Sequence, residues 1–180
     1  APMTQEHFLR GAMERHGASV YRLALCRLQS VPDAEDVYQE VFLQLLRQPE
    51  RDWDEEHLKA WLLRTALNRC ADLGRLHLRR PAVPLEEIAD AAGEDSSQAV
   101  ELWEAVSRLP QKLRTVVHLF YAEGYSTEEI AAMLGCPAAT VRTRLRRARK
   151  QLKSLLGGME DEEEPLSNAD GTNSPTCRAQ

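Results

Sequence analysis

Apolar residues recur every three or four positions along almost the whole chain, the spacing that places them on one face of an α-helix. No segment alternates apolar and polar residues convincingly enough to predict a strand. The loops SVPD and QPERDWDEEH, together with RRPAVP, interrupt the pattern in the first half of the chain. Helices are predicted over 8–28, from about 33 to the second of these loops, and over 58–78, 98–108 and 110–123, with two more between 126 and 155. The predicted fold class is all-α.

The helix that follows SVPD has a well-defined inner and outer face. Asp33 is placed to act as its N-cap or as a first-turn acid. The inward stripe is expected to consist of Val37, Val41 and Leu45 with their neighbours Tyr38, Phe42 and Leu46. The outward positions are Asp36, Gln39, Glu40 and Gln44, which by themselves indicate only a solvated surface.

The stretch YSTEEIAAMLGCPAATVRTRLRRARKQL predicts a helix-turn-helix. Ser126 and Glu129 fit a capping box, and Gly135 is suited to end the short first helix. A longer helix of roughly 27 Å follows from Pro137 or the next residue. Its apolar residues step by four and three along one face: Val141, Leu145, Ala148, Leu152 and Leu155.

The formal net charge of −5 hides a strong division along the chain. Residues 81–106 contain seven acids and no Lys or Arg, and residues 157–180 contain six acids and one Arg. Residues 107–156 contain ten Lys or Arg and three Glu, which is the charge pattern of a segment that contacts nucleic acid. The division predicts an N-terminal helical bundle at 1–80, an acidic linker at 81–97, a C-terminal four-helix domain at 98–156 and an acidic, disordered tail at 157–180.

The cations of the long helix cluster on its outer surfaces. A solvated helix usually mixes charges of both signs, but no Asp or Glu occurs between residues 131 and 159. Small residues at the start of this helix allow it to approach a DNA groove, and Arg can bind guanine edges or phosphates. The candidate DNA-binding residues are Ala139, Thr140, Arg142, Thr143, Arg146, Arg147 and Lys150.

The remaining chemistry-bearing residues do not form a predicted catalytic site. The four cysteines and five histidines lack the spacing of metal ligands, and the thiols are expected to be small core residues in a reducing cytoplasm. The sequence shows no catalytic triad and no phosphate-binding loop. We therefore expect no cofactor, no metal and no enzymatic activity, and the chain has no apolar run that predicts membrane insertion.

The segment RLPQKLRTVVHLFYAEGYSTEEIAAMLGCPAATVRTRLRRARKQL closely resembles region four of the extracytoplasmic-function sigma factors, which are specificity subunits of bacterial RNA polymerase. DAEDVYQEVFLQLLR resembles the region-two segment of this family that binds polymerase. LKAWLLRTALNRCADLGRLHLRRP resembles its promoter-opening segment, which reads the minus-ten element. The resemblance covers roughly residues 8–155, with both modules in the family's order.

The resemblance implies a role for each module. The clamp helices of the largest polymerase subunit would bind Asp36, Gln39 and Glu40. The C-terminal half would contact the flap of the second-largest subunit. The cationic helix would bind the minus-thirty-five element. The loop QPERDWDEEH would wall a pocket for a flipped base, with Asp72 on the helix beside it, although pairing of Asp72 with Arg69 or Arg75 is an equal alternative. The candidate minus-ten residues are Trp61, Arg64, Asn68, Arg69, Asp72, Arg75, Arg79 and Arg80, with Trp61 more commonly a core residue at such a position.

The resemblance also implies that the chain is an alternative sigma factor that helps to melt promoter DNA. Such a factor would be cytoplasmic, and nucleoid-associated when active. An anti-sigma factor would hold it inactive, in some family members at the membrane. An autonomous helix-turn-helix repressor or activator is the alternative, although the sequence shows no extra dimerisation helix. A metal-dependent nuclease using Asp33, Glu35, Asp36 and Glu40 is a further alternative that lacks a complete ligand set.

Overall fold

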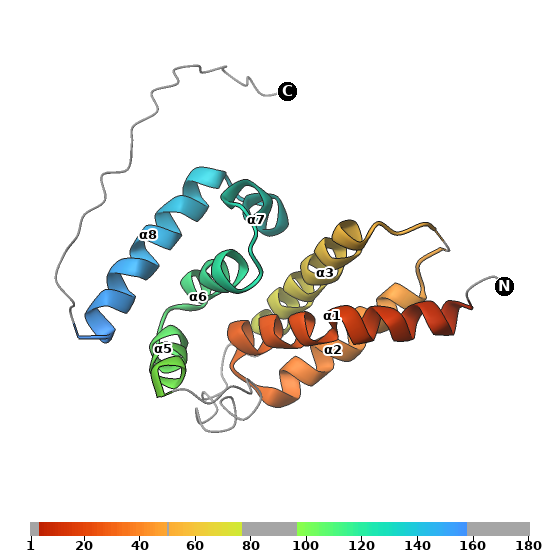
Figure 1. Cartoon of the computed structure of the whole chain (residues 1–180), viewed down its shortest axis with the longest axis horizontal. Helices are drawn as coiled ribbons and strands as arrows, with labels where there is room; N and C mark the ends of the chain where they lie inside the picture. The colour runs from red at the N-terminus through yellow and green to blue at the C-terminus, as the bar shows by residue number, and fades with distance from the viewer. Residues whose placement is uncertain (1–3, 50, 77–96, 158–180) are drawn as a thin grey trace, which may run out of the picture.

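The computed structural model describes residues 4–49, 51–76 and 97–157, and within these ranges every regular element is a helix. In the N-terminal half, α1 (Gln5–Leu28), α2 (Val31–Leu46) and α3 (Glu55–Leu76) pack against one another. In Figure 1 they form the group coloured red to yellow. The predicted all-α fold class is confirmed.

Local capping fixes the start of α2. The hydroxyl of Ser30 accepts a hydrogen bond from the backbone N–H of Asp33, so Ser30 is the N-cap and Asp33 is the first-turn acid. Just before it, Gln29 takes a left-handed conformation (φ 51°) and ends α1. The two helices are therefore joined by a sharp turn. The loop predicted over residues 48–57 is shorter in the structure, because α3 already begins at Glu55.

The C-terminal half contains α5 (Ser97–Ser107), α6 (Gln111–Val117), the π-helical turn η1 (His118–Ala122), α7 (Thr127–Leu134) and α8 (Ala138–Leu155). The capping box of Ser126 and Glu129 is present, and Gly135 ends α7 with φ 64°, as the sequence predicts. The single helix predicted over 110–123 differs, because its last turn widens into η1. The helix-turn-helix prediction is confirmed.

The apolar faces predicted from the spacing are largely buried. Val37, Val41 and Leu45 of α2 and Val141 and Leu145 of α8 are each at most 3% exposed. The stripes fail at their ends. Leu46 is 38% exposed and Leu155 is 41% exposed, and each lies in the last turn of its helix.

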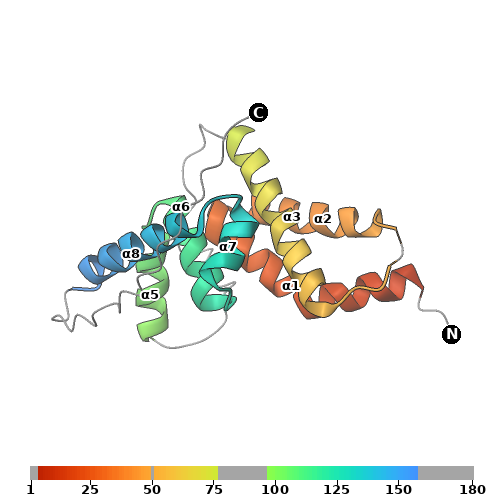
Figure 2. The same cartoon turned by 90° about the horizontal axis from the view of Figure 1, so that it is seen from above.

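The two halves are in direct contact, which the sequence pattern does not indicate. The helices α6 and η1 pack on α1, and α7 packs on α3, as the second view shows (Figure 2). Buried side chains of both halves belong to one continuous apolar cluster. The predicted acidic linker and tail fall almost entirely outside the described residues. Among the helices that are described, none combines the length and apolarity needed to cross a bilayer.

Candidate nucleic-acid and polymerase interfaces

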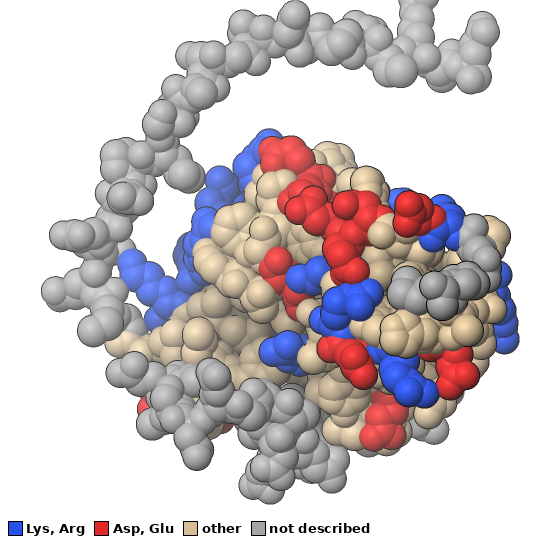
Figure 3. Space-filling view, turned by 45° about the vertical axis from the view of Figure 1, so that its right-hand side comes forward, with Lys and Arg blue, Asp and Glu red and all other residues tan. Residues whose placement is uncertain are grey.

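The outer face of α8 presents a row of cations to solvent. Inward packing of Val141, Leu145 and Ala148 fixes the rotation of the helix. Figure 3 shows Lys and Arg gathered along the edge of the molecule that α8 forms. Of the predicted DNA-binding residues, five are exposed and two, Thr140 and Thr143, are half-buried; the exposed ones are Ala139, Arg142, Arg146, Arg147 and Lys150.

Most of these cations are available to a ligand. Arg142 approaches Glu128 of α7 at 3.7 Å, where both side chains are more than half exposed. Within the described part of the chain, Arg146, Arg147 and Lys150 have no carboxylate partner. Surface ion pairs contribute little, so the Arg142 contact is easily exchanged for a phosphate. The face can therefore bind an anionic surface such as DNA.

A second polar row follows α3. Arg64, Asn68, Asp72 and Arg75 are all exposed, and their spacing of four, four and three places them on one face. Asp72 pairs with Arg75 at 3.0 Å, which is one of the alternatives left open by the sequence. The pair is exposed and can be separated by a ligand. Arg79 and Arg80 lie outside the described residues.

The loop between α2 and α3 walls a cavity of about 350 Å³. The guanidinium carbon of Arg51 lies 3.6 Å from the centre of the Trp53 ring, and Trp53 meets Trp61 edge-on at 5.6 Å between ring centres. The lining residues come from α1, α2 and the loop: Gln5, Phe8, Leu9, Leu45, Leu46, Gln48, Pro49, Arg51, Asp52 and Trp53. The volume is that of a small-molecule or single-base site.

The expected position of Asp72 beside this cavity is wrong. Asp72 does not line it, because the loop joins the N-terminal end of α3 and Asp72 lies four to five turns further along, roughly 25 Å away. Trp61 does not line the cavity either and is half-buried behind Trp53. Phe8 and Leu9 of α1 also line the cavity, which was not predicted from the sequence. Their apolar spacing on α1 was visible, but their proximity to the loop depends on the tertiary packing.

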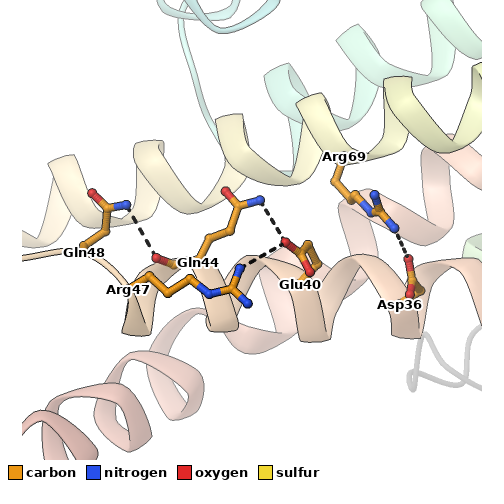
Figure 4. A network of polar contacts seen from close by, with 6 residues as sticks. All are labelled: Asp36, Glu40, Gln44, Arg47, Gln48 and Arg69. Carbon is orange, nitrogen blue, oxygen red and sulfur yellow. Dashed lines mark hydrogen bonds and ion pairs between the residues drawn. The ribbon is translucent and has the colours of Figure 1, made fainter.

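Two of the three predicted polymerase-binding residues, Asp36 and Glu40, take part in polar contacts on α2 (Figure 4). Asp36 accepts a hydrogen bond from Arg69 of α3 at 3.0 Å. Glu40 accepts one from Gln44 at 3.2 Å and lies 3.9 Å from Arg47. Gln39 is exposed. Both acidic side chains of this group are therefore held by neighbouring polar groups.

The contact between Asp36 and Arg69 joins a candidate polymerase residue to a candidate minus-ten residue. The two side chains are 51% and 32% exposed, so the pair lies at the surface between α2 and α3. Sequence reasoning assigned the residues to separate sites and missed the contact. No local pattern could have revealed a pairing between residues that are 33 positions apart.

Two of the cysteines in the described part of the chain are core residues, and Cys177 lies outside that part. Cys26 and Cys70 are buried and Cys136 is half-buried. Burial raises the pKa of the Cys70 thiol to about 12, which keeps it protonated and unreactive at neutral pH. In the described portion, no group of three or more His, Cys, Asp or Glu side chains is arranged to hold a metal ion.

Comparison with known proteins assigns both halves to one family. Residues 12–80 match the family model Sigma-70 region 2, and residues 99–152 match Sigma-70, region 4. The ECF RNA polymerase sigma factor SigM of Mycobacterium tuberculosis is 32% identical over 145 residues, which cover 79% of this chain and 74% of that protein. The RNA polymerase sigma factor SigV of Bacillus subtilis is 30% identical over 143 residues, covering 78% of this chain and 86% of that protein.

Solved structures with the same fold include CnrH in complex with the cytosolic domain of CnrY. It has a TM-score of 0.58 and 28% identity, covering 84% of this chain and 88% of that one. The sigma factor RpoE of Bartonella quintana, in complex with the anti-sigma factor NepR, has a TM-score of 0.61, 22% identity and coverage of 84% and 95%. The chain belongs to the extracytoplasmic-function sigma factors of the sigma-70 family. It is an alternative sigma factor that directs RNA polymerase to promoters, and the sigma factor family consists of non-enzymatic transcription initiation factors.

Proposed function

We propose that this sigma factor binds promoter DNA with two separate surfaces while it is held by core RNA polymerase. The single observation that carries the proposal is the cationic face of α8, which is solvent-exposed along its length and has an interior-facing apolar stripe that fixes its orientation. Arg142 and Arg146 would donate hydrogen bonds to base edges, and Arg147 and Lys150 would bind phosphates. This face would bind the minus-thirty-five element.

The second DNA surface is the exposed row on α3 together with the cavity walled by the α2–α3 loop. Arg64, Asn68 and Arg75 would follow the phosphates of the unpaired non-template strand. The cavity has the size and the aromatic wall suited to one flipped base, and Trp53 offers a stacking surface. Asp72 would instead contact the strand further along α3, after separating from Arg75.

Docking on polymerase would use the network on α2. Asp36 and Gln39 are exposed and Glu40 is half-buried, and the three would meet basic side chains of the clamp helices of the largest subunit. The C-terminal half would contact the flap of the second-largest subunit. The acidic linker at 81–97 would pass through the basic nucleic-acid channel, between a polymerase-binding domain at 1–80 and a DNA-binding domain at 98–156.

The polymerase would supply all of the chemistry, and this chain would require no metal or cofactor. RpoE of Bartonella quintana forms a complex with the anti-sigma factor NepR, and CnrH forms one with the cytosolic domain of CnrY. We extend that to this chain and propose an anti-sigma partner, a cytoplasmic location when free, and association with the nucleoid when active.

Run-off transcription with purified core polymerase and a promoter library tests the proposal. Specific transcripts should form only when the chain is present, and sequencing of the active templates gives its two promoter elements. Absence of transcripts would contradict the proposal. Tight and specific duplex binding by the chain alone, without any effect on transcription start, would indicate the autonomous repressor or activator instead.

A further inference from the structure

The sequence that follows α8 carries a run of five consecutive acids. Residues 160–164 read EDEEE, and no Lys or Arg occurs from residue 154 to residue 177. Neighbouring like charges repel one another, and blocks of this kind commonly serve as interaction segments. We call residues 160–164 the acidic run. The cationic surface nearest to it along the chain is the outer face of α8.

The middle of α8 presents three cations that are close together on its surface. Arg146, Arg147 and Lys150 are exposed, and in the part of the chain that the structure describes they have no carboxylate partner. Arg146 and Arg147 precede Lys150 by four and three positions, so both are its neighbours on the helix surface. Like charges at this spacing destabilise a helix slightly, and an anion that binds between them relieves the repulsion. We call these three residues the α8 patch.

The acidic run lies within reach of the α8 patch. The helix ends at Leu155, and Gly157 follows with φ 80°, a left-handed conformation that stops a helix. At the helical rise, Lys150 and Arg146 lie roughly 10 and 17 Å back along the axis from Gly157. An extended chain from Gly157 reaches about 10 Å at residue 160 and about 24 Å at residue 164. The run can therefore cover the whole patch without any change in α8.

The end of α8 itself is an unfavourable place for the acids. The last carbonyl groups of a helix carry a partial negative charge, which disfavours carboxylates beside the final turn. The α8 patch lies further back, where the cations determine the potential. Attachment through the few residues between Gly157 and the acidic run also keeps its local concentration on the order of millimolar, so even a weak site is occupied.

The acidic run resembles one strand of DNA in the spacing of its charges. An extended chain places one carboxylate about every 3.4 Å, and a DNA strand places one phosphate about every 3.4 Å along the duplex axis. The guanidinium and ammonium groups that would bind phosphates can therefore bind these carboxylates in the same way. The patch cannot hold both ligands at once.

We propose that the acidic run occupies the α8 patch in the free chain and that promoter DNA displaces it. This inference rests on the proposed function, in which the same face of α8 binds the minus-thirty-five element. The run acts as an intramolecular competitor that lowers the affinity of the free chain for every duplex by the same factor. It keeps the free chain off random DNA, whereas the polymerase complex adds contacts of its own and overcomes the competition.

Replacing the acidic run by amides tests the competition. The variant carries Glu160→Gln, Asp161→Asn, Glu162→Gln, Glu163→Gln and Glu164→Gln. Fluorescence anisotropy with a labelled duplex of random sequence measures the affinity of the full chain at a series of KCl concentrations. At low salt the affinity should rise about tenfold, the effect of removing about three exposed ion pairs. The wild-type and variant affinities should converge as salt rises, because salt also screens the contacts of the run.

The acids before the C-terminal half provide a matched control. Residues 81–97 contain five acids, and their replacement by amides changes the net charge by the same amount: Glu86, Glu87, Asp90, Glu94 and Asp95. This control should raise the affinity much less than the variant does. Both chains should keep the wild-type helical content by circular dichroism. Equal gains would show general charge repulsion and would overturn the contact between the acidic run and the α8 patch.

A carbodiimide, which joins a carboxylate to an amine in direct contact, locates the acidic run. Mass spectrometry of the free chain should find Lys150 joined to residues 160–164, whereas Lys112, an exposed lysine of α6, should not be joined to them. Saturating duplex should abolish the Lys150 link. Links between isotopically light and heavy chains would assign the patch to the acidic run of a second copy and would overturn the proposal.

The contact and the proposed function fail separately. A missing Lys150 link, or one that persists with saturating duplex, would overturn the contact, while run-off transcription by the wild-type chain would leave the proposed function intact. Absence of specific transcripts with core polymerase would overturn the proposed function. In that case the Lys150 link and its loss with duplex would still report the competition between the acidic run and DNA.

Discussion

Replacing Glu123 by Gln is expected to weaken the whole fold and to change how stability depends on pH. The substitution keeps the size of the side chain but removes the carboxylate that faces Lys59 of α3 and His118 of η1. The Cys26 sulfur of α1 and the Tyr125 ring complete the polar surroundings of the network. Two cationic groups are then left without their shared counter-charge.

The magnitude follows from the burial of the partners. Removing one partner of a fully buried ion pair costs about 3–5 kcal/mol, whereas exposed pairs contribute about 0–1 kcal/mol. Glu123 and His118 are 6% and 5% exposed at their side chains, but Lys59 is 30% exposed and can recover hydration. We therefore expect the free energy of unfolding to fall by about 2 kcal/mol at pH 6.

The pH dependence gives the prediction its specificity. The pKa of His118 is raised from 6.5 to about 9, so its contribution is complete below pH 6.5 and is lost as pH rises through 9. The pKa of Glu123 is lowered from 4.5 to about 2, so its contribution is complete above pH 4.5 and is lost as pH falls through 2. The difference between wild type and Glu123→Gln should therefore be largest from pH 4.5 to 6.5 and should shrink towards pH 9.

Urea unfolding followed by circular dichroism, repeated from pH 5 to 9, provides the measurement. Glu6→Gln is the matched control, because Glu6 is 82% exposed in a pair with Arg10 at the start of α1. The control should unfold like the wild type at every pH. A stability difference for Glu123→Gln that is absent, or constant from pH 5 to 9, would refute the assignment of a charged pair to Glu123 and His118.

Three further substitutions address the proposed interfaces. Asp36→Arg should abolish run-off transcription without unfolding the chain, since the pair of Asp36 with Arg69 is exposed. Glu35→Arg, on the same helix, should retain activity. Equal activity of the two variants would show that Asp36 does not contact polymerase. Arg146→Ala should weaken binding of the polymerase complex to the minus-thirty-five element by about 1–3 kcal/mol in a competition assay. Unchanged affinity would show that the Arg146 side chain does not contact DNA. Trp53→Ala should weaken binding of a minus-ten single strand by about 1–3 kcal/mol in a fluorescence titration with the polymerase complex, and full retention would exclude stacking in the cavity.

Local features of the fold were predictable because their causes lie in neighbouring residues. The capping box at Ser126, the left-handed Gly135 and the apolar steps of α8 are each determined within one or two helical turns. The apolar spacing predicts burial of Leu46 and Leu155, but both are partly exposed, because spacing alone does not show how completely neighbouring side chains cover the last turn of a helix. The π-helical turn η1 was missed for a related reason, since its sequence HLFYA continues an ordinary helical pattern.

The contact between the halves could not be predicted from the sequence. Arg114 resembles any other arginine of a basic segment, and its partners are backbone carbonyls that have no signature in the sequence. The ion pair of Lys59 with Glu123 connects residues 64 positions apart. The outward position of the cations of α8 was predictable, because periodicity determines which positions of a helix face solvent. The interior position of Arg114 is the exception that required tertiary structure.

Promoter melting provides the most direct test of the central claim that both halves work together on polymerase-bound DNA. A 2-aminopurine base in the non-template strand of the minus-ten element becomes brighter when it unstacks. Fluorescence should rise only when the chain, core polymerase and both promoter elements are present together. A full rise without the chain, or none with the complete set on a promoter selected by run-off transcription, would contradict it.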